Sequence, residues 1–393
     1  MVAAIRAARL GRRVGLIEKS PSLGRKLLAS GGQRCNLSNT LGIEEFMERV
    51  GRDGRFMSPA LDGLGGPKLR EFFHGIGVQT VVHDGFRVWP ETRKSSTVLN
   101  GLLGELKRLS VSIIASCEVT EADFLDGKFQ VRHANGVYQS DDLIIATGGL
   151  ALPKSGAAGG GYDIASRFGH RITVRHPAGV PLVSAENWTG RCTAHTIGKA
   201  QLQVAMPKHS RILRVGDLIF TKQGIRGPVV LDISREISPL LDKYEQVPIW
   251  ISLCPERTQD DWQKLFKAWR MGPDKPVVAC LMEHLPKEVS EVLCELAGVE
   301  GDLAIHRLKG EPRDGLIRTL VKTPLTITDT TGYDGAFITR GGVRLKDVRP
   351  DTLESKLQPG LYLCGEVLDL DGPCGGFNLQ WAFASGYLAA AGR

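Results

Sequence analysis

The sequence lacks the residue patterns of metal sites, membrane spans and several common catalytic centres. Its eight cysteines form no Cys-x-x-Cys pair and no cluster with histidine at zinc-ligand spacing. No apolar stretch approaches the roughly 20 residues that a membrane helix needs. The arginine-studded N-terminus has no long apolar core of the kind found in signal peptides. We therefore expect a cytoplasmic protein with reduced thiols, no metal and no membrane partner.

Length and composition place the chain among ordinary globular proteins. Its 393 residues are too many for one simple core and favour two or three domains. The 47 glycines stand out, and they indicate the tight turns and close backbone approaches of nucleotide-binding α/β proteins. The net charge of +7 suits either a polyanionic partner such as RNA or simply a basic soluble enzyme. On charge alone we favour the second interpretation.

The N-terminal residues follow the pattern of half a dinucleotide-binding unit. An alanine-rich helix over 2–10 ends at Gly11, and a short buried strand over 14–17 leads to Glu18. In a βαβ unit an acid at this place accepts hydrogen bonds from a ribose hydroxyl. The strand and G-x-G-x-x-G turn that begin such a unit do not precede the helix. An acid at a strand end is weak evidence alone, because most such residues are simply solvated.

A polar, glycine-rich and basic loop follows directly over residues 23–39. Its Gly31-Gly32 pair permits close approach of the backbone to a ligand. Arg25, Lys26 and Arg34 supply donors for a phosphate or another anionic group. An ordinary surface loop is the alternative, and we favour a ligand-binding loop because it directly follows Glu18.

Residues 142–146 predict a buried parallel strand that runs into Thr147-Gly148-Gly149 and returns the chain to the central sheet. The glycine cluster over 156–161 lacks a preceding apolar strand and the spacing of a second nucleotide site. We therefore expect no dedicated NAD(P)-binding domain.

The middle of the chain differs in character from both ends. Strand patterns dominate from His176 to Trp250, among them 218–221 and 229–233, and they predict a β-rich domain. Residues 260–297 carry apolar side chains at helical spacing, which is far more typical of a core than of a cofactor site.

The C-terminal segment is the most informative part of the sequence. A strand over 360–364 ends in Gly365-Glu366, whose carboxylate could accept hydrogen bonds from ligand hydroxyls. Gly375-Gly376 then leads into a helix that begins near Phe377, and a helix N-terminus favours an anion. A plain glycine-capped helix is the alternative, and it is the weaker one beside the two N-terminal features.

These strings resemble the YhiN/BaiN-like bacterial flavoproteins over nearly the whole chain, most specifically at 24–36, 146–149 and 365–383. The resemblance implies an α/β fold with an FAD-binding Rossmann domain of the two-dinucleotide-binding type, over 1–172 and 319–393. It also implies an inserted β-rich domain over 173–256 and a small helical subdomain over 257–318. The residues that we assign to FAD are Glu18, Arg25, Lys26, Ser30, Gly31, Gly32, Arg34, Thr147, Gly148, Gly365, Glu366, Gly375, Gly376, Phe377 and Asn378.

The sequence departs from the family pattern at three places. The family's first strand and Gly-rich turn are missing, so we expect the native protein to start upstream of Met1. Gln33 stands where the family usually has glycine, and Cys374 where threonine is expected.

The resemblance implies a flavin-dependent oxidoreductase that reduces a conjugated C=C bond, with NAD(P)H as a possible electron donor. One branch of the family acts on uracil in ribosomal RNA and another on steroid-like enones. Cys35 and Asn36 are our candidates for the catalytic residues, and Asp369 and Asp371 are alternatives as proton donors.

The basic charge favours ribosomal RNA as the substrate, held by the β-rich domain. The residues that would contact its phosphates are Arg191, Lys199, Lys208, Arg211, Arg214, Lys222 and Arg226. A solvated basic face is the alternative for these residues. A small-molecule enone reductase or amine oxidase, and a non-catalytic FAD- or RNA-binding protein, remain the other candidate functions.

Overall fold

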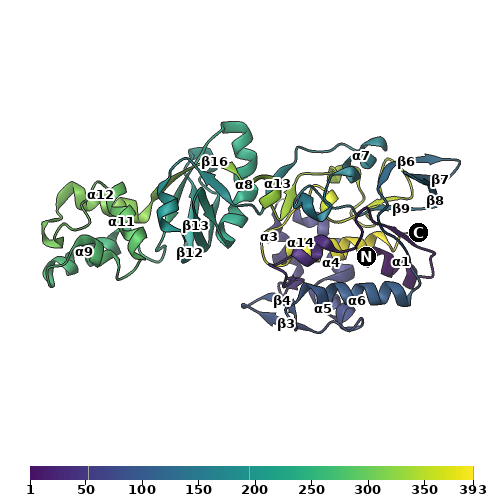
Figure 1. The fold of residues 1–393 in the computed structure, drawn as a ribbon, viewed down its shortest axis with the longest axis horizontal. Helices are drawn as coiled ribbons and strands as arrows, with labels where there is room; N and C mark the ends of the chain where they lie inside the picture. Colours follow the sequence, from purple (N-terminus) through teal and green to yellow (C-terminus); the bar gives the residue numbers. More distant parts are fainter. Residues whose placement is uncertain (52, 194, 393) are drawn as a thin grey trace. The chain divides into compact units, whose positions relative to one another are not determined.

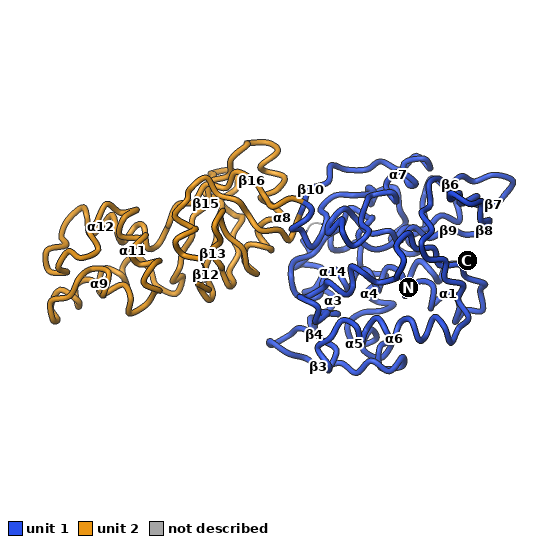
Figure 2. The backbone as a smooth tube through the Cα atoms, in the orientation of Figure 1, with its two compact units in different colours: residues 1–177, 333–393 blue, residues 178–332 orange. Residues whose placement is uncertain are grey.

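The computed structural model describes residues 1–51, 53–193 and 195–392, and its chain forms two compact units. Unit 1 comprises residues 1–177 and 333–393, and unit 2 comprises residues 178–332 (Figure 2). Each unit buries its own hydrophobic cluster, and the two clusters share no residue. Unit 2, which is inserted into the sequence of unit 1, therefore has a hydrophobic core of its own.

Two pairs of parallel strands position the predicted ligand residues of unit 1. Strand β1 (Gly15–Ile17) pairs with β5 (Ser112–Ile114), and β18 (Leu361–Leu363) pairs with β9 (Leu143–Ile145). The carboxyl ends of such strands are where ligands bind in α/β sheets. Because β9 and β18 run in parallel and in register, the Thr147-Gly148 and Gly365-Glu366 segments leave the sheet at the same edge.

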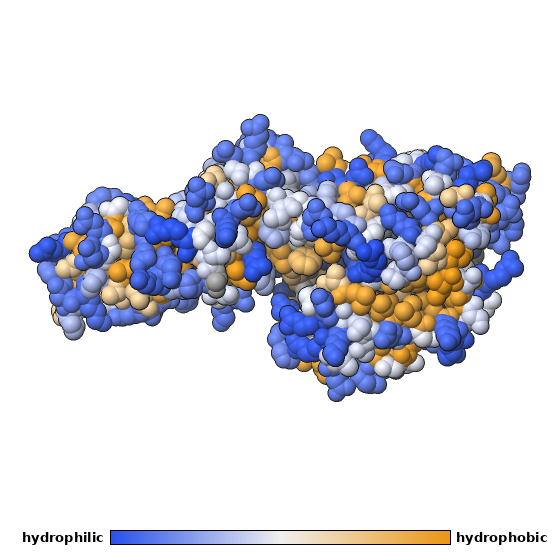
Figure 3. All heavy atoms as spheres, viewed as in Figure 1, coloured by the Kyte–Doolittle hydropathy of each residue, from blue (hydrophilic) through white to orange (hydrophobic). Residues whose placement is uncertain are grey.

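The helices of unit 1 surround α14, which begins at Phe377 and ends at Ala389. Eight of its 13 residues are buried, and it packs against α4 and α1 (Figure 1). A helix that is apolar on most sides is stable only inside a core. On the face shown in Figure 3, apolar atoms gather over the region of α14, α4 and α1. The other α-helices of unit 1 are α1 (Val2–Arg9), α2 (Arg25–Ala29), α3 (Ile43–Val50), α4 (Ser58–Leu64), α5 (Gly66–His74), α6 (Ser95–Arg108), α7 (Gly160–Arg167) and, at the return from unit 2, α13 (Gly332–Gly335).

Unit 1 also contains two three-stranded antiparallel sheets, and near the end of its first segment β10 (His176–Ala178) forms a two-stranded sheet with β17 (Ile338–Arg340). One three-stranded sheet has the order β2-β4-β3 and the other β6-β7-β8. Their strands are β2 (Ser38–Asn39), β3 (Thr80–His83), β4 (Arg87–Pro90), β6 (Val119–Leu125), β7 (Lys128–His133) and β8 (Gly136–Ser140). Strand β2 pairs with β4 through Ser38 and Val88, which anchors the glycine-rich loop that precedes it.

Unit 2 is built on a closed six-stranded barrel with the strand order β11-β14-β13-β12-β15-β16. Its strands are β11 (Leu182–Ser184), β12 (Thr196–Val204), β13 (Leu213–Thr221), β14 (Gly224–Arg226), β15 (Val247–Ser252) and β16 (Thr323–Thr330). Four helices follow β15: α9 (Gln259–Met271), α10 (Val277–Leu281), α11 (Lys287–Leu296) and α12 (Gly310–Val321). The expected β-rich insertion with a helical subdomain is therefore present.

Two details differ from the sequence-based expectation. Residues 229–233, expected as a strand, lie in helix α8 (Pro228–Tyr244), where Pro228 occupies the first turn. Strand β16, expected in the FAD-binding part over 319–393, pairs with both β15 and β11 and closes the barrel. The return to unit 1 consequently comes at 332/333 and not at 318/319.

Candidate functional site

Glu18 follows β1 and is half-buried at the carboxyl end of that strand. Its Oε1 accepts a hydrogen bond from the Ser20 backbone N–H at 2.7 Å, and no described residue donates to the other oxygen. The Ser20 hydroxyl is buried and has no partner within the described part of the chain. Because buried polar groups are normally hydrogen-bonded, these two groups suit the hydroxyls of a ribose.

The glycine-rich loop runs through consecutive left-handed residues. Gly31, Gly32 and Gln33 have φ values of 56°, 64° and 69°. Only glycine adopts this conformation without steric cost, which explains why glycine is usual where Gln33 stands. All three residues are exposed.

Cys35 and Asn36 end the loop in different environments. Cys35 is fully buried, and burial raises the pKa of its thiol to about 12. The Asn36 amide satisfies its surroundings when its oxygen accepts from the Gly376 N–H at 3.0 Å and its nitrogen donates to the Ser38 carbonyl at 2.8 Å. Asn36 thus joins the N-terminal loop to the start of α14, and the structure brings these two distant segments together.

A second link joins the same two regions of the sequence. Lys26 Nζ lies 2.5 Å from Glu366 Oε2, and Glu366 Oε1 accepts from the Thr339 N–H at 2.9 Å. The Thr339 hydroxyl in turn accepts from the N–H groups of Leu150 and Ala151. Thr339 therefore orients Glu366 and ties it to the segment after β9. Sequence reasoning missed Thr339, because a threonine in β17 (Ile338–Arg340) carries no motif.

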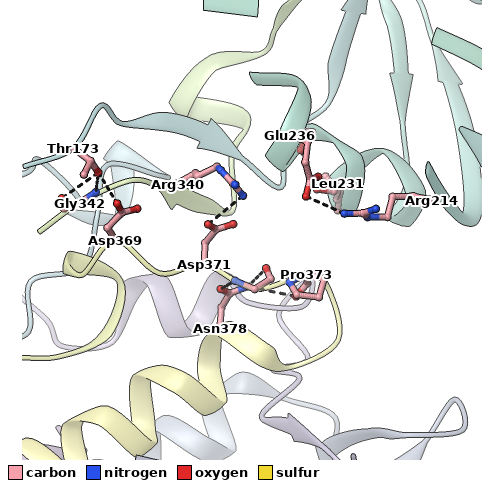
Figure 4. Close-up of polar contacts among 12 residues, drawn as sticks. Thr173, Arg214, Leu231, Glu236, Arg340, Gly342, Asp369, Asp371, Pro373 and Asn378 are labelled. Atoms are coloured by element: carbon pink, nitrogen blue, oxygen red, sulfur yellow. Dashed lines mark hydrogen bonds and ion pairs between the residues drawn. The ribbon is translucent and has the colours of Figure 1, made fainter. Parts of the chain in front are cut away.

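The start of α14 is shaped by packing within the protein. Gly376 has φ 86°, and a β-carbon there would lie 2.4 Å from the Ser38 carbonyl oxygen. Phe377 is buried against Phe46, with ring centroids 4.5 Å apart. The Asn378 amide bonds the N–H and C=O of Gly372, both at 2.8 Å (Figure 4). Beyond the Asn36 contact to the Gly376 N–H, no side chain in the described part of the chain caps α14, so the positive end of its dipole can accept an anion.

The remaining predicted residues lie around these segments. Thr147 is exposed after β9, and Gly148 turns the chain with φ 73°. Gly375, with φ 123°, lies against the ring of Phe86. Arg25 donates to the Lys154 carbonyl, and the Arg34 guanidinium lies over the Trp89 ring. The Ser30 hydroxyl donates to the Leu27 carbonyl. The Gly365 N–H donates to the Ser385 hydroxyl.

Two aspartates, Asp369 and Asp371, follow Glu366 in the segment between β18 and α14. Asp369 is half-buried and accepts from the Thr173 hydroxyl at 2.9 Å (Figure 4). Burial raises the pKa of Asp369, and the nearby charges of Asp371 and Asp53 raise it further. Asp371 lies 3.5 Å from Arg340. Among the described residues no group of three His, Cys, Asp or Glu side chains could hold a metal ion.

Comparison with known proteins shows the family to which this chain belongs. The family model described as the HI0933-like protein Rossmann domain matches residues 1–392. The chain belongs to the HI0933-like family. It is 36% identical to the 3-dehydro-bile acid delta(4,6)-reductase of Clostridium scindens, over 99% of this chain and 95% of that protein. It is 29% identical to the ribosomal RNA dihydrouridine synthase of Escherichia coli, over 98% and 92% of the two chains.

A solved structure supports the fold independently. The 3-ketosteroid delta1-dehydrogenase of Sterolibacterium denitrificans aligns with a TM-score of 0.51 at 12% identity, over 99% of this chain and 96% of that one. No helix in the described part of the chain is long and apolar enough to cross a membrane.

This HI0933-like protein is a flavin-dependent oxidoreductase, and its cofactor is FAD. The residues present fit that group at two ends of the site. Glu18 and the unpaired Ser20 hydroxyl suit the ribose, and the start of α14 suits an anionic part of the cofactor. The paired Lys26 and Glu366 lie on segments that converge on the same region.

Proposed function

We propose that this protein reduces a C=C bond conjugated to a carbonyl group. One observation carries the proposal. Two relatives that match almost the whole chain are a 3-dehydro-bile acid delta(4,6)-reductase and a ribosomal RNA dihydrouridine synthase. Dihydrouridine forms by reduction of the C5=C6 bond of uracil, which is conjugated to a carbonyl, so both names describe the same chemistry. When bound, reduced FAD supplies the hydride.

Reduction of such a bond also needs a proton at the carbon that does not receive the hydride. We assign that proton to the Asp369 carboxyl, whose raised pKa keeps it protonated at higher pH than an ordinary aspartate. Thr173 holds the carboxyl in place through its hydroxyl. Cys35 is the second candidate, but a buried thiol with a pKa of about 12 is a weak acid near neutral pH. Asn36 then serves to position the loop.

The test uses the FAD-loaded protein under anaerobic conditions with NADH or NADPH as the donor. We expect turnover of a 3-keto-4,6-diene steroid or of uridine in ribosomal RNA. Asp369→Asn should lower kcat by about 100-fold or more, the usual contribution of a general acid, while Cys35→Ser should stay within a few-fold. The reverse order would assign the proton to Cys35. Absence of product from both substrates would refute C=C reduction.

Ribosomal RNA is the second candidate substrate, favoured by part of the surface of unit 2. Lys208, Arg211, Lys222 and Arg226 are exposed and have no carboxylate partner among the described residues. Two of the predicted phosphate contacts are instead neutralised, Arg191 by Glu295 and Arg214 by Glu236.

The salt dependence of the binding affinity distinguishes the two candidate substrates. RNA held by four phosphate contacts should bind with an affinity that falls about as the third to fourth power of salt concentration. Turnover of a steroid enone without measurable RNA affinity would instead assign a small-molecule substrate. We place either reaction in the cytoplasm.

A further inference from the structure

A hollow of about 200 Å³ lies within unit 2, lined by strands β12 and β15 and by the ends of two nearby helical segments. Gln201 pairs with Ser252 in the register of these strands, and Trp250 lies two residues before Ser252. Their neighbours Leu202 and Ile251 are buried in the barrel core. Because side chains alternate along a strand, Gln201, Trp250 and Ser252 face outward into the hollow.

Two cations border the hollow, and both rest on indole rings. Lys322 Nζ lies 4.2 Å from the centroid of the Trp250 ring, and the Arg257 guanidinium carbon lies 5.5 Å from that of Trp262. Neither cation forms an ion pair with a described residue, and no acidic residue lines the hollow itself. An opposite charge that acts on Arg257 is that of Asp261, which accepts from the Thr258 hydroxyl at the edge of the hollow. A cation–π contact fixes a charged group without neutralising it. The hollow therefore carries two positive charges in defined places.

Neutral hydrogen-bonding groups lie beside these charges. The Gln201 amide and the Ser252 hydroxyl make no hydrogen bond to any described residue, although Ser252 is only 8% exposed. Gln201 is half-buried, and the Ser252 hydroxyl is not fully enclosed by the protein, so both groups are accessible to a ligand. An amide and a hydroxyl beside a guanidinium and an ammonium form a donor set that suits an oxyanion.

We propose that this hollow binds a phosphoryl group, carried by a free nucleotide or by an RNA chain. Its volume is below the roughly 300–1,000 Å³ of pockets that enclose whole ligands, so it takes a charged group and little more. Two cations match a phosphoryl group better than the single charge of a carboxylate. Arg257 offers a planar fork of donors and Lys322 a point charge, the two common ways of holding phosphate oxygens.

The experiment measures binding to the full chain by calorimetry at low salt. The probes are inorganic phosphate, uridine 5′-monophosphate and a ten-residue oligouridylate, with acetate as the carboxylate control. Lys322→Met and Arg257→Met should each weaken phosphoryl binding at least tenfold. Gln201→Glu, which places a carboxylate in the hollow, should abolish it. Lys243→Met removes a lysine that lies over Tyr244 outside the hollow, and it should bind as the unchanged protein does.

The results show whether the phosphoryl group belongs to a free nucleotide or to an RNA chain, and whether the hollow binds one at all. Equal affinity for the mononucleotide and the oligomer assigns a free nucleotide, and a clear preference for the oligomer assigns an RNA chain. Binding that persists in a Lys322→Met, Arg257→Met double variant, or no phosphoryl binding to the unchanged protein at millimolar concentration, overturns the proposal. Circular dichroism confirms that each variant is folded. No turnover is measured, so failure here leaves the proposed C=C reduction untouched.

Discussion

Gly376 immediately precedes α14, has a positive φ and lies against the backbone of Ser38. Gly376→Ala would force strand β2 and the helix apart, and we expect the free energy of unfolding to fall by about 3 kcal/mol or more. Gly32→Ala is the matched control, because Gly32 also has a positive φ but faces open space. The control should cost only about 1 kcal/mol. Urea unfolding of both variants measures the difference, and equal losses would contradict the packing role of Gly376.

Single glycines in a motif can serve the cofactor site or the packing of the protein. The sequence assigns the Gly375-Gly376 pair and Asn378 to FAD, and in the structure these residues also make contacts within the protein. A sequence pattern cannot separate a glycine that faces a ligand from one that faces another strand, because both need the same missing side chain. Only the positions of Ser38 and Phe86 decide which contact each glycine makes.

At the level of elements, Glu105 joins α6 to α1. Its carboxylate accepts from Arg108 in the same helix and from Arg9 of α1, and its side chain is 6% exposed. The hydrogen bond from Arg108, with further stabilisation from Arg9, lowers the pKa of Glu105 to about 2. A carboxyl with a lowered pKa stabilises the fold fully above its unfolded pKa of about 4.3. This stabilisation is lost as the pH falls toward 2.

Replacement of Glu105 by Gln should therefore remove a pH-dependent part of the stability. We expect a loss of roughly 1–3 kcal/mol at pH 7, and a flatter stability profile between pH 4.5 and 2. Glu48→Gln, at an exposed helical position without an ion pair among the described residues, should leave the profile unchanged. Chemical unfolding across this pH range measures both variants, and a parallel profile for Glu105→Gln would contradict the assignment.

Element boundaries followed from the sequence where a local signal existed. Strands β3 and β4 form an antiparallel hairpin whose turn lies between two apolar runs of the same short segment. Val229, Val230 and Ile233 have β-branched side chains, but residues 229–233 form the first turns of α8, whose apolar face is buried on the barrel. Tertiary packing overrode the local preference there.

On the scale of the whole molecule, unit 2 should fold without unit 1. Its barrel is closed, its helices share its core, and its residues are continuous in sequence. We expect a fragment of residues 178–332 to unfold cooperatively, with a circular dichroism spectrum of mixed helix and strand. A fragment without a cooperative transition would show that the two units depend on each other.

Removal of FAD should destabilise the two units unequally. The residues that fit the cofactor all belong to unit 1, so the ligand stabilises that unit by mass action. Calorimetry of the whole chain with and without FAD should show one transition that moves down by several degrees. The transition that matches the isolated 178–332 fragment should stay in place. Equal shifts of both transitions would contradict this assignment.

The sequence alone determined the family, the FAD-binding Rossmann fold and the β-rich insertion, because long strings and local strand and helix patterns carry that information. The tertiary structure decided what depends on distant residues. It paired Lys26 with Glu366 across 340 positions and joined Asn36 to Gly376. It also showed that β16 belongs to the barrel, where it pairs with β11 and β15. The residues of a strand do not by themselves identify its partners, because pairing depends on which other strand edges are available for hydrogen bonds.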